Sequence, residues 1–163
     1  MADISYHPIG VIRSPFSQQQ GTPIQPVFAG PARGRVEVDP RYREALADLA
    51  GFERVWLLYD FDRAGSYQAK VTPYRDTTPR GLFATRAPTR PNRIGISAVK
   101  LIAVEADGLV VEEIDVLDGT PLLDIKPYVP QFDAYPQAKA GWLEQKNNER
   151  TAADDRFEPG KQP

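Results

Sequence analysis

The sequence predicts an all-β protein, namely an antiparallel β-barrel with one short helix and an extended carboxy-terminal segment. Three observations lead to this fold class. Sixteen prolines and twelve glycines in 163 residues interrupt the chain too often for long helices. Short apolar runs rich in β-branched residues are separated by turn residues. Because helical patterns do not alternate with these runs, the strands are expected to pair antiparallel and close into a barrel.

The apolar runs differ in character, which indicates their places in the barrel. Residues 54–61 are apolar almost throughout, as expected of a strand buried on both faces. Two β-branched runs meet at Asp107-Gly108, which is the best hairpin signal in the chain. Strands are expected at residues 9–13, 34–38, 54–61, 67–71, 81–85, 96–104, 109–116 and 122–125.

One helix is expected before residue 130, beginning at residue 40 and ending near residue 50. Asp39 is a typical N-cap residue, and Pro40 suits the first helical position because its fixed φ already matches a helix. Apolar residues then repeat at helical spacing, and Gly51 ends the run.

The composition becomes polar after Pro130. Residues 141–150 are expected to form a short helix, whereas residues 151–163 are expected to be frayed or disordered because they offer few apolar side chains to bury. We therefore expect a barrel domain over residues 1–135 and a carboxy-terminal extension over residues 136–163.

The composition excludes several kinds of site. The chain has no cysteine and one histidine, so disulfides, thiolate metal sites and histidine clusters are excluded, and no metal is expected. It lacks a Walker A loop and a Gly-x-Gly-x-x-Gly sequence after a strand, which disfavours a Rossmann-type methyltransferase. A Ser-His-Asp hydrolase would have to use His7, near the amino terminus.

The hydropathy pattern predicts a protein without a membrane partner. No apolar run approaches the roughly 18 residues that span a bilayer. Residues 1–15 lack the apolar core of a signal peptide. A soluble, cytoplasmic protein is expected.

The charge is distributed unevenly along the chain, although the formal net charge is only -2. Residues 70–100 carry seven lysines and arginines against one acid, a balance of +6. Residues 101–163 carry 13 acids and six bases, a balance of -7. The basic segment is therefore suited to bind phosphates or carboxylates, and the alternative is that its arginines pair with the acidic second half.

Two loops have the composition of a binding site. Proline, glycine and asparagine fix an irregular backbone over residues 81–95, from which Arg86, Arg90 and Arg93 project. Such a loop can present guanidinium groups and backbone N–H groups to an anion, or it can be a loop with solvated arginines. In the loop of residues 14–27, Gln25 can read the edge of a ligand, and a plain surface loop is the alternative.

A third segment, residues 117–128, carries two charges of opposite sign. Asp124 and Lys126 are two residues apart on an expected strand, so their side chains lie on the same face. That spacing suits an ion pair, or an acid whose pKa is set by the neighbouring cation. From the residues alone, the structural ion pair is the better interpretation.

Together, four stretches resemble the TrmO family, also called the TsaA-like or YaeB-like family. The stretches are PIGVIRSPF, FERVWLLYDF, GLFATRAPTRPNRIGIS and LDGTPLLDIKPYVP, and they span residues 8–130. The last two are long and specific. The chain resembles a short form of the family, without the carboxy-terminal domain of the longer bacterial members.

The resemblance implies an antiparallel barrel that forms a homodimer and binds S-adenosylmethionine near the subunit interface. It also implies methylation of N6 of threonylcarbamoyl-adenosine at position 37 of tRNA. Two positions depart from the family pattern, since the family usually has histidine at Asp62 and proline at Arg93. The cofactor site carried over by motif comprises Gln25, Pro26, Val27, Phe61, Asp62, Arg86, Ile96, Asp118, Gly119, Thr120, Pro121 and Leu122.

The chemistry of this acceptor suggests further roles. Its nitrogen is a ureido-type N–H, a poor nucleophile unless the proton is removed, so a general base is expected. Asp124 is the candidate base, with Lys126 or Tyr128 positioning it, and Arg90 and Arg93 are the candidate contacts to RNA. The alternatives are a different methyl acceptor, a barrel that binds S-adenosylmethionine without catalysis, and an RNA-binding module.

Overall fold

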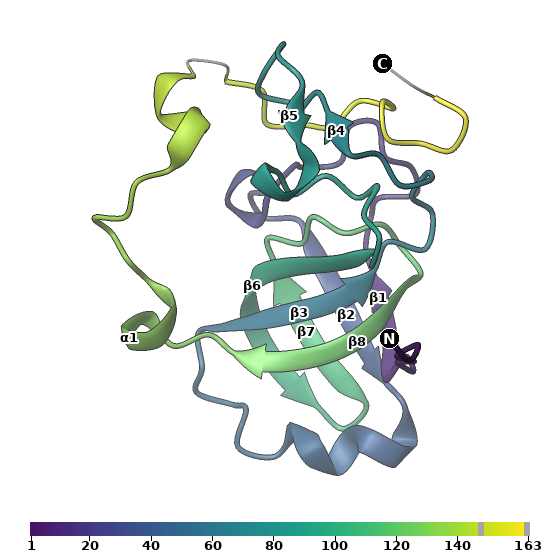
Figure 1. The fold of residues 1–163 in the computed structure, drawn as a ribbon. Helices are drawn as coiled ribbons and strands as arrows, with labels where there is room; N and C mark the ends of the chain where they lie inside the picture. Colours follow the sequence, from purple (N-terminus) through teal and green to yellow (C-terminus); the bar gives the residue numbers. More distant parts are fainter. Residues whose placement is uncertain (147–148, 162–163) are drawn as a thin grey trace.

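Six strands close into a barrel at the centre of the molecule (Figure 1). The computed structural model describes residues 1–146 and 149–161. Every neighbouring pair in the barrel is antiparallel, which confirms the predicted fold class. In order around the barrel the strands are β1 (Gly10–Arg13), β2 (Arg33–Val38), β7 (Gly108–Glu112), β6 (Ile94–Glu105), β3 (Arg54–Asp60) and β8 (Thr120–Pro127).

Side chains of β3 alternate between the barrel interior and its outer surface. Val55, Leu57 and Tyr59 are buried in the core, whereas Trp56 and Leu58 are only partly buried. The expectation that this strand is buried on both faces is therefore corrected. A barrel has one packed interior, so every second residue of each strand points outward.

A bulge in β8 changes which of its residues face the interior. Leu122 lies opposite Tyr59, yet Asp124 lies opposite Leu58, so Leu123 is an extra residue in the ladder. Leu122 is fully buried, whereas the Asp124 side chain is 44% exposed on the outer face. Without the bulge, Leu122 and Asp124 would share one face.

The predicted hairpin is confirmed at the turn between β6 and β7. Glu105 pairs with Gly108, so the turn contains two residues, Ala106 and Asp107. Glycine is required at position 108 because a Cβ there would lie 1.8 Å from the carbonyl oxygen of Val36. This close contact lets β7 pair with β2 directly after the turn.

The expected helix after Asp39 is a 3₁₀ helix, η2 (Pro40–Leu46), and it is shorter than predicted. Asp39 is its N-cap, since the side chain accepts a hydrogen bond from Arg41 N at 3.0 Å. The helix ends at Leu46 because the next residue, Ala47, leaves the helical conformation with a ψ of 142°.

The remaining helices of residues 1–146 and 149–161 are also short. Only α1 (Pro130–Asp133) is α-helical within these residues, and no helix there has the length and apolarity to cross a membrane. The other 3₁₀ helices are η1 (Pro26–Phe28), η3 (Leu82–Ala84) and η4 (Gly141–Gln145).

A small second layer lies above one end of the barrel. It contains the two-stranded sheet of β4 (Lys70–Val71) and β5 (Arg80–Gly81) (Figure 1). Both are shorter than predicted, and the expected strand at 81–85 is mostly η3. Thr85 closes this turn, because its N–H and its hydroxyl both donate hydrogen bonds to the Leu82 carbonyl.

The segment of residues 151–161 packs on this layer, which differs from the expected frayed tail. Phe157 is 2% exposed and lies in a second apolar cluster with Val71, Leu82 and Ala87. Phe157 is the single aromatic side chain of this segment, and the polar composition of the segment did not predict its burial. The helix expected at residues 141–150 is limited to η4, and residues 147–148 lie outside the described residues.

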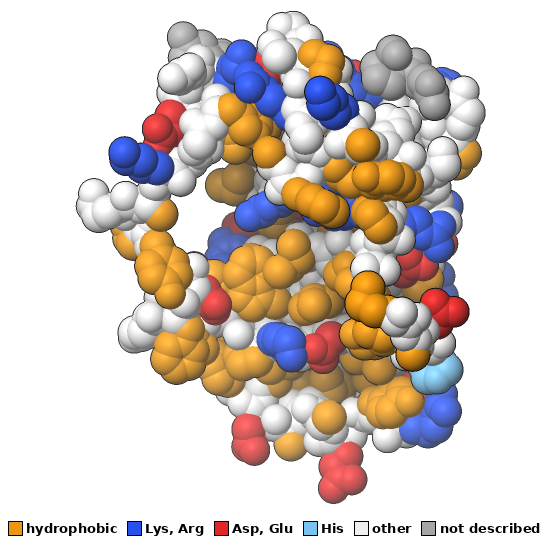
Figure 2. All heavy atoms as spheres, viewed as in Figure 1, with side chains coloured by type: hydrophobic (Ala, Val, Ile, Leu, Met, Phe, Trp, Pro, Cys, Tyr) orange, Lys and Arg blue, Asp and Glu red, His pale blue; other side chains and the backbone are white. Residues whose placement is uncertain are grey.

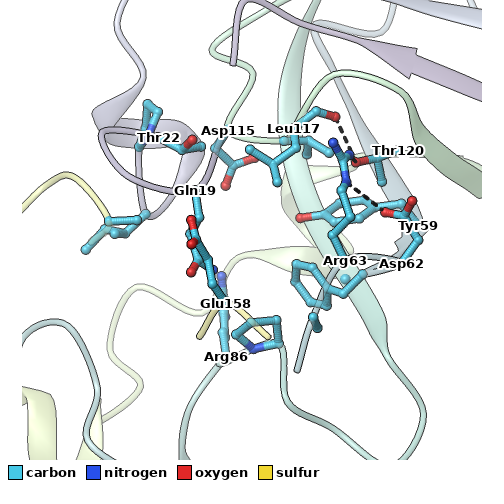
Figure 3. Close-up of a pocket in the computed structure, with 18 of the residues that line it drawn as sticks. Gln19, Thr22, Tyr59, Asp62, Arg63, Arg86, Asp115, Leu117, Thr120 and Glu158 are labelled. Carbon is cyan, nitrogen blue, oxygen red and sulfur yellow. Dashed lines mark hydrogen bonds and ion pairs between the residues drawn. The ribbon is translucent and has the colours of Figure 1, made fainter. Parts of the chain in front are cut away.

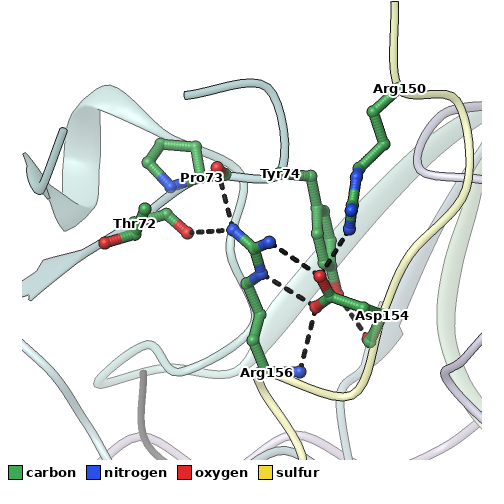
Figure 4. Close-up of polar contacts among 6 residues, drawn as sticks. All are labelled: Thr72, Pro73, Tyr74, Arg150, Asp154 and Arg156. Atoms are coloured by element: carbon green, nitrogen blue, oxygen red, sulfur yellow. Dashed lines mark hydrogen bonds and ion pairs between the residues drawn. The ribbon is translucent and has the colours of Figure 1, made fainter. Parts of the chain in front are cut away.

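Polar contacts fix the same segment (Figure 4). Arg156 forms an ion pair with Asp154 at 2.7 Å and donates hydrogen bonds to the carbonyl oxygens of Thr72 and Pro73, each at 3.1 Å. Ala153 N donates to Thr22 O at 2.7 Å, which joins the tail to the loop that precedes η1. The tail therefore connects β4 to one of the loops at the barrel end.

We predict that Phe157→Ala lowers the free energy of unfolding by about 3 kcal/mol, because it removes a buried aromatic ring and leaves a cavity. Urea denaturation measures the change. Phe132→Ala is the control, since Phe132 is 72% exposed and should change stability little. Equal stability of the two variants would show that the tail does not pack as described.

Candidate functional site

A pocket of about 730 Å³ opens at the end of the barrel that the second layer covers (Figure 3). This volume lies within the range of small-molecule sites, about 300–1,000 Å³. Loops between strands and the carboxy-terminal tail form the wall. The lining residues come mostly from segments 17–25, 59–64, 85–96, 115–120 and 153–159.

The structure brings six of the predicted cofactor-site residues together around this pocket, although they come from four separate segments. Arg90, one of the predicted RNA contacts, lines it as well. The six cofactor-site residues are Gln25, Phe61, Asp62, Arg86, Ile96 and Thr120.

The other cofactor-site residues shape the loops beside the pocket. Asp118 accepts a hydrogen bond from Ser14 N at 3.1 Å, and Gly119 adopts a left-handed φ of 80° in the turn before β8. Leu122 is part of the barrel core. The residues outside the pocket lining are Pro26, Val27, Asp118, Gly119, Pro121 and Leu122.

The predicted catalytic residues lie on the outer face of β8 and after it, outside the pocket lining. Asp124 and Lys126 form an ion pair at 2.8 Å, as the structural interpretation of their spacing predicted. The carboxylate raises the pKa of Lys126. Tyr128 packs against Trp56 with ring centroids 5.4 Å apart. The structure therefore does not bring these three residues to the pocket wall.

Two pocket arginines are held in place by polar partners. Arg86 Nη1 donates to Gln25 Oε1 at 2.6 Å, which ties the arginine-rich loop to the loop before η1. Arg63 Nη2 donates to Thr120 Oγ1 at 3.0 Å, and Arg63 Nε donates to Asp62 at 3.3 Å. Each guanidinium is thus positioned before any ligand arrives. Arg63 was not predicted, because a lone arginine after a strand carries no local signal.

A chain of hydrogen bonds that the sequence did not predict also reaches the pocket. The Tyr59 hydroxyl lies 3.0 Å from Ser97 Oγ, which donates to Asp115 Oδ1 at 2.6 Å. Tyr59 and Ser97 are buried, and Tyr59 and Asp115 line the pocket (Figure 3). A single aspartate between Ile114 and Val116, both buried, was the available signal.

Burial raises the pKa of Asp115 to about 7, although the hydrogen bond from Ser97 and the charge of Arg86 act to lower it. Burial also raises the pKa of the Tyr59 hydroxyl far above its usual range, and the Asp115 charge acts in the same direction. The aspartate therefore changes its protonation state near neutral pH. Perturbed carboxyl groups of this kind are frequent at functional sites.

The pocket has the groups that S-adenosylmethionine requires. Arg86 and Arg63 can bind its carboxylate, whereas Asp62 suits its cationic groups. Phe61 and Ile96 provide apolar surface for the adenine ring. Among the described residues, Gln19 Oε1 is a buried acceptor on the pocket wall without a hydrogen-bond partner.

A closed antiparallel barrel with a pocket of this size, mostly apolar but with several charged side chains in its wall, defines a ligand-binding β-barrel protein. Residues 11–134 match the family described as the N-terminal domain of tRNA-methyltransferase O. The chain belongs to this family, the TrmO family, and the sequence prediction is confirmed.

Known relatives support the same family. A protein of Pyrococcus abyssi named a probable S-adenosyl-L-methionine-binding protein is 46% identical over 156 residues, 94% of this chain and 85% of the relative. Human tRNA (adenine(37)-N6)-methyltransferase is 39% identical over 134 residues, 78% of this chain and 30% of the human protein. The crystal structure of TrmO from Pseudomonas aeruginosa matches with a TM-score of 0.74 and 44% identity, covering 86% of this chain and 63% of that one.

The chain spans less than two thirds of the human protein and of the crystallised TrmO chain. It spans most of the archaeal relative. The shared part contains the barrel strands and most of the segments that line the pocket.

Proposed function

We propose that this protein methylates tRNA with S-adenosylmethionine, at N6 of threonylcarbamoyl-adenosine in position 37. The observation that carries the proposal is the meeting of Gln25, Phe61, Asp62, Arg86, Ile96 and Thr120 around one pocket. The names of the human and archaeal relatives support a tRNA methyltransferase and an S-adenosylmethionine site. A tRNA substrate is consistent with the expected cytoplasmic location.

In this proposal the main tasks of the protein are to bind and orient S-adenosylmethionine and the acceptor, and to exclude water. S-adenosylmethionine supplies an activated methyl group when it is bound. Arg86 and Arg63 are fixed by Gln25 and Thr120, so they can hold a carboxylate without reorganisation. Holding the acceptor nitrogen in line with the methyl group can lower the barrier by roughly 7–11 kcal/mol.

The RNA contact is proposed at the basic segment beside the pocket. Phe83 is 78% exposed, and the Arg90 guanidinium lies 5.6 Å from the centre of its ring. Arg90 also donates to the carbonyl oxygens of Thr85 and Ala87. An exposed ring beside a fixed guanidinium is a suitable stacking surface for an unstacked anticodon-loop base.

A homodimer is part of the proposal. Hydrophobic side chains gather over β3, β6 and β8 on the face shown in Figure 2. Ile94 and Ile96 of β6 are 42% and 43% exposed there, beside the partly buried Trp56 and Leu58. A second copy that covered this face would bury apolar surface next to the pocket, which Ile94 and Ile96 also line.

The deciding assay offers labelled S-adenosylmethionine with tRNA that does or does not contain threonylcarbamoyl-adenosine. We expect label in the modified tRNA only. Transfer to both tRNAs would indicate a different acceptor. Calorimetric binding of S-adenosylmethionine without transfer to either tRNA would contradict the proposed reaction and favour a binding protein.

Substitution of Arg90 and Arg93 by alanine should weaken tRNA binding several-fold across tRNA sequences. The slope of log K for tRNA binding against log salt concentration should decrease in magnitude by about one for each lost phosphate contact. Filter binding at several salt concentrations measures both quantities. Arg41→Ala is the control, since Arg41 lies on η2 and pairs with Asp39. An unchanged slope in the double variant would count against this surface.

A further inference from the structure

Asp115 differs from Asp62 and Asp124 in having no cation bound to it. Among the described residues, no lysine or arginine forms an ion pair with Asp115, and its carboxyl accepts a hydrogen bond from Ser97 at 2.6 Å. Asp62 is paired with Arg63 at 3.3 Å, and Asp124 is paired with Lys126. A carboxylate without a bound cation is the stronger proton acceptor of the three.

We propose that Asp115 is the catalytic base, and that its carboxylate accepts the proton from the nitrogen that is methylated. The inference rests on the proposed function and adds a residue to it. A new N–C bond forms while the carbon–sulfur bond breaks, and its electron pair stays on sulfur. The N–H proton moves to the Asp115 carboxylate, from which it later leaves to water.

The geometry around Asp115 suits this role. Ser97 fixes the carboxyl through Oδ1, so that the second oxygen, Oδ2, can meet a bound acceptor. The Tyr59 hydroxyl lies 3.0 Å from Ser97 Oγ and helps to hold the Ser97 side chain in position. Ser97 is therefore a positioning residue, because it acts on the reaction through Asp115.

Burial and the charged groups around Asp115 together place the pKa of its carboxyl near neutral pH. Arg86 from the arginine-rich loop lowers the pKa, whereas burial raises it to about 7. Tyr59 of β3 stays neutral because its own pKa is raised. Arg63 after β3 and Glu158 of the tail line the same pocket. A general base works best when its pKa lies near the working pH.

The test measures single-turnover methylation of modified tRNA. It compares Asp115→Asn with the variants Ser97→Ala, Asp107→Asn and Asp124→Asn. Asp115→Asn keeps an oxygen that can accept from Ser97, and we expect at least about 100-fold slower transfer with nearly unchanged calorimetric affinity for S-adenosylmethionine. Ser97→Ala should remain active but move the rate–pH midpoint upward, since it removes a hydrogen bond that favours the charged carboxylate. Asp107→Asn, at the β6–β7 hairpin outside the pocket, should match the wild type.

The ionisation of the Asp115 carboxyl can also be measured independently of activity. In ¹³C-aspartate-labelled protein, the Asp115 carboxyl signal should titrate near pH 7 and be absent from Asp115→Asn. Because the folded pKa lies above the unfolded value, wild-type stability should fall as pH rises from about 4 to about 7. The Asp115→Asn variant should lack this part of the pH dependence, and its melting temperature should therefore exceed that of the wild type at pH 8.

The outcomes separate the two proposals. Full activity of Asp115→Asn with an unchanged pH profile would overturn the role of Asp115, and so would a loss of turnover in Asp124→Asn alone. If Asp115→Asn failed to fold, an unshifted pH profile in Ser97→Ala would also overturn it. Transfer by the wild type to neither tRNA would instead contradict the proposed function.

Discussion

The pairing of β8 with both β1 and β3 is the constraint on which the rest of the structure depends. These two ladders close the sheet, remove its free edges and enclose an apolar interior. Closure also places the turn before β8 beside the ends of β3 and β6, so that Thr120, Tyr59 and Asp115 meet at one opening. The perturbed aspartate is a consequence, because a carboxyl group beside a packed interior is poorly solvated.

The second layer forms part of the wall around this opening. The loops that carry β4 and β5 are held against the tail by the cluster around Phe157 and by Arg156. The tail contributes Glu158 and Ala153 to the pocket wall. Stability of the tail and shape of the site are therefore linked, although the tail is remote in sequence from every strand that forms the barrel.

Local sequence patterns predicted those features that local interactions decide. The β6–β7 hairpin and the cap at Asp39 depend on neighbouring residues, and both occur, although the turn residues are Ala106 and Asp107 rather than Asp107 and Gly108. The β8 bulge and the burial of Phe157 depend on partners far along the chain, so no local pattern showed them. Motif resemblance located half of the predicted cofactor-site residues in the pocket lining, but it did not distinguish these from residues beside the pocket. Asp115 was not predicted because its importance lies in its desolvation at the pocket and its contact with Ser97, which no local pattern shows.

The proposed function requires the pocket at the barrel end to hold S-adenosylmethionine between the loops joined by Arg86 and Gln25. Calorimetric titration with S-adenosylmethionine, comparing the wild type with Arg86→Ala, tests it most directly. Arg33→Ala is the matched control, because Arg33 pairs with Glu112 on the barrel surface. We expect at least tenfold weaker binding by Arg86→Ala and wild-type binding by Arg33→Ala. Equal affinity of all three proteins would contradict it.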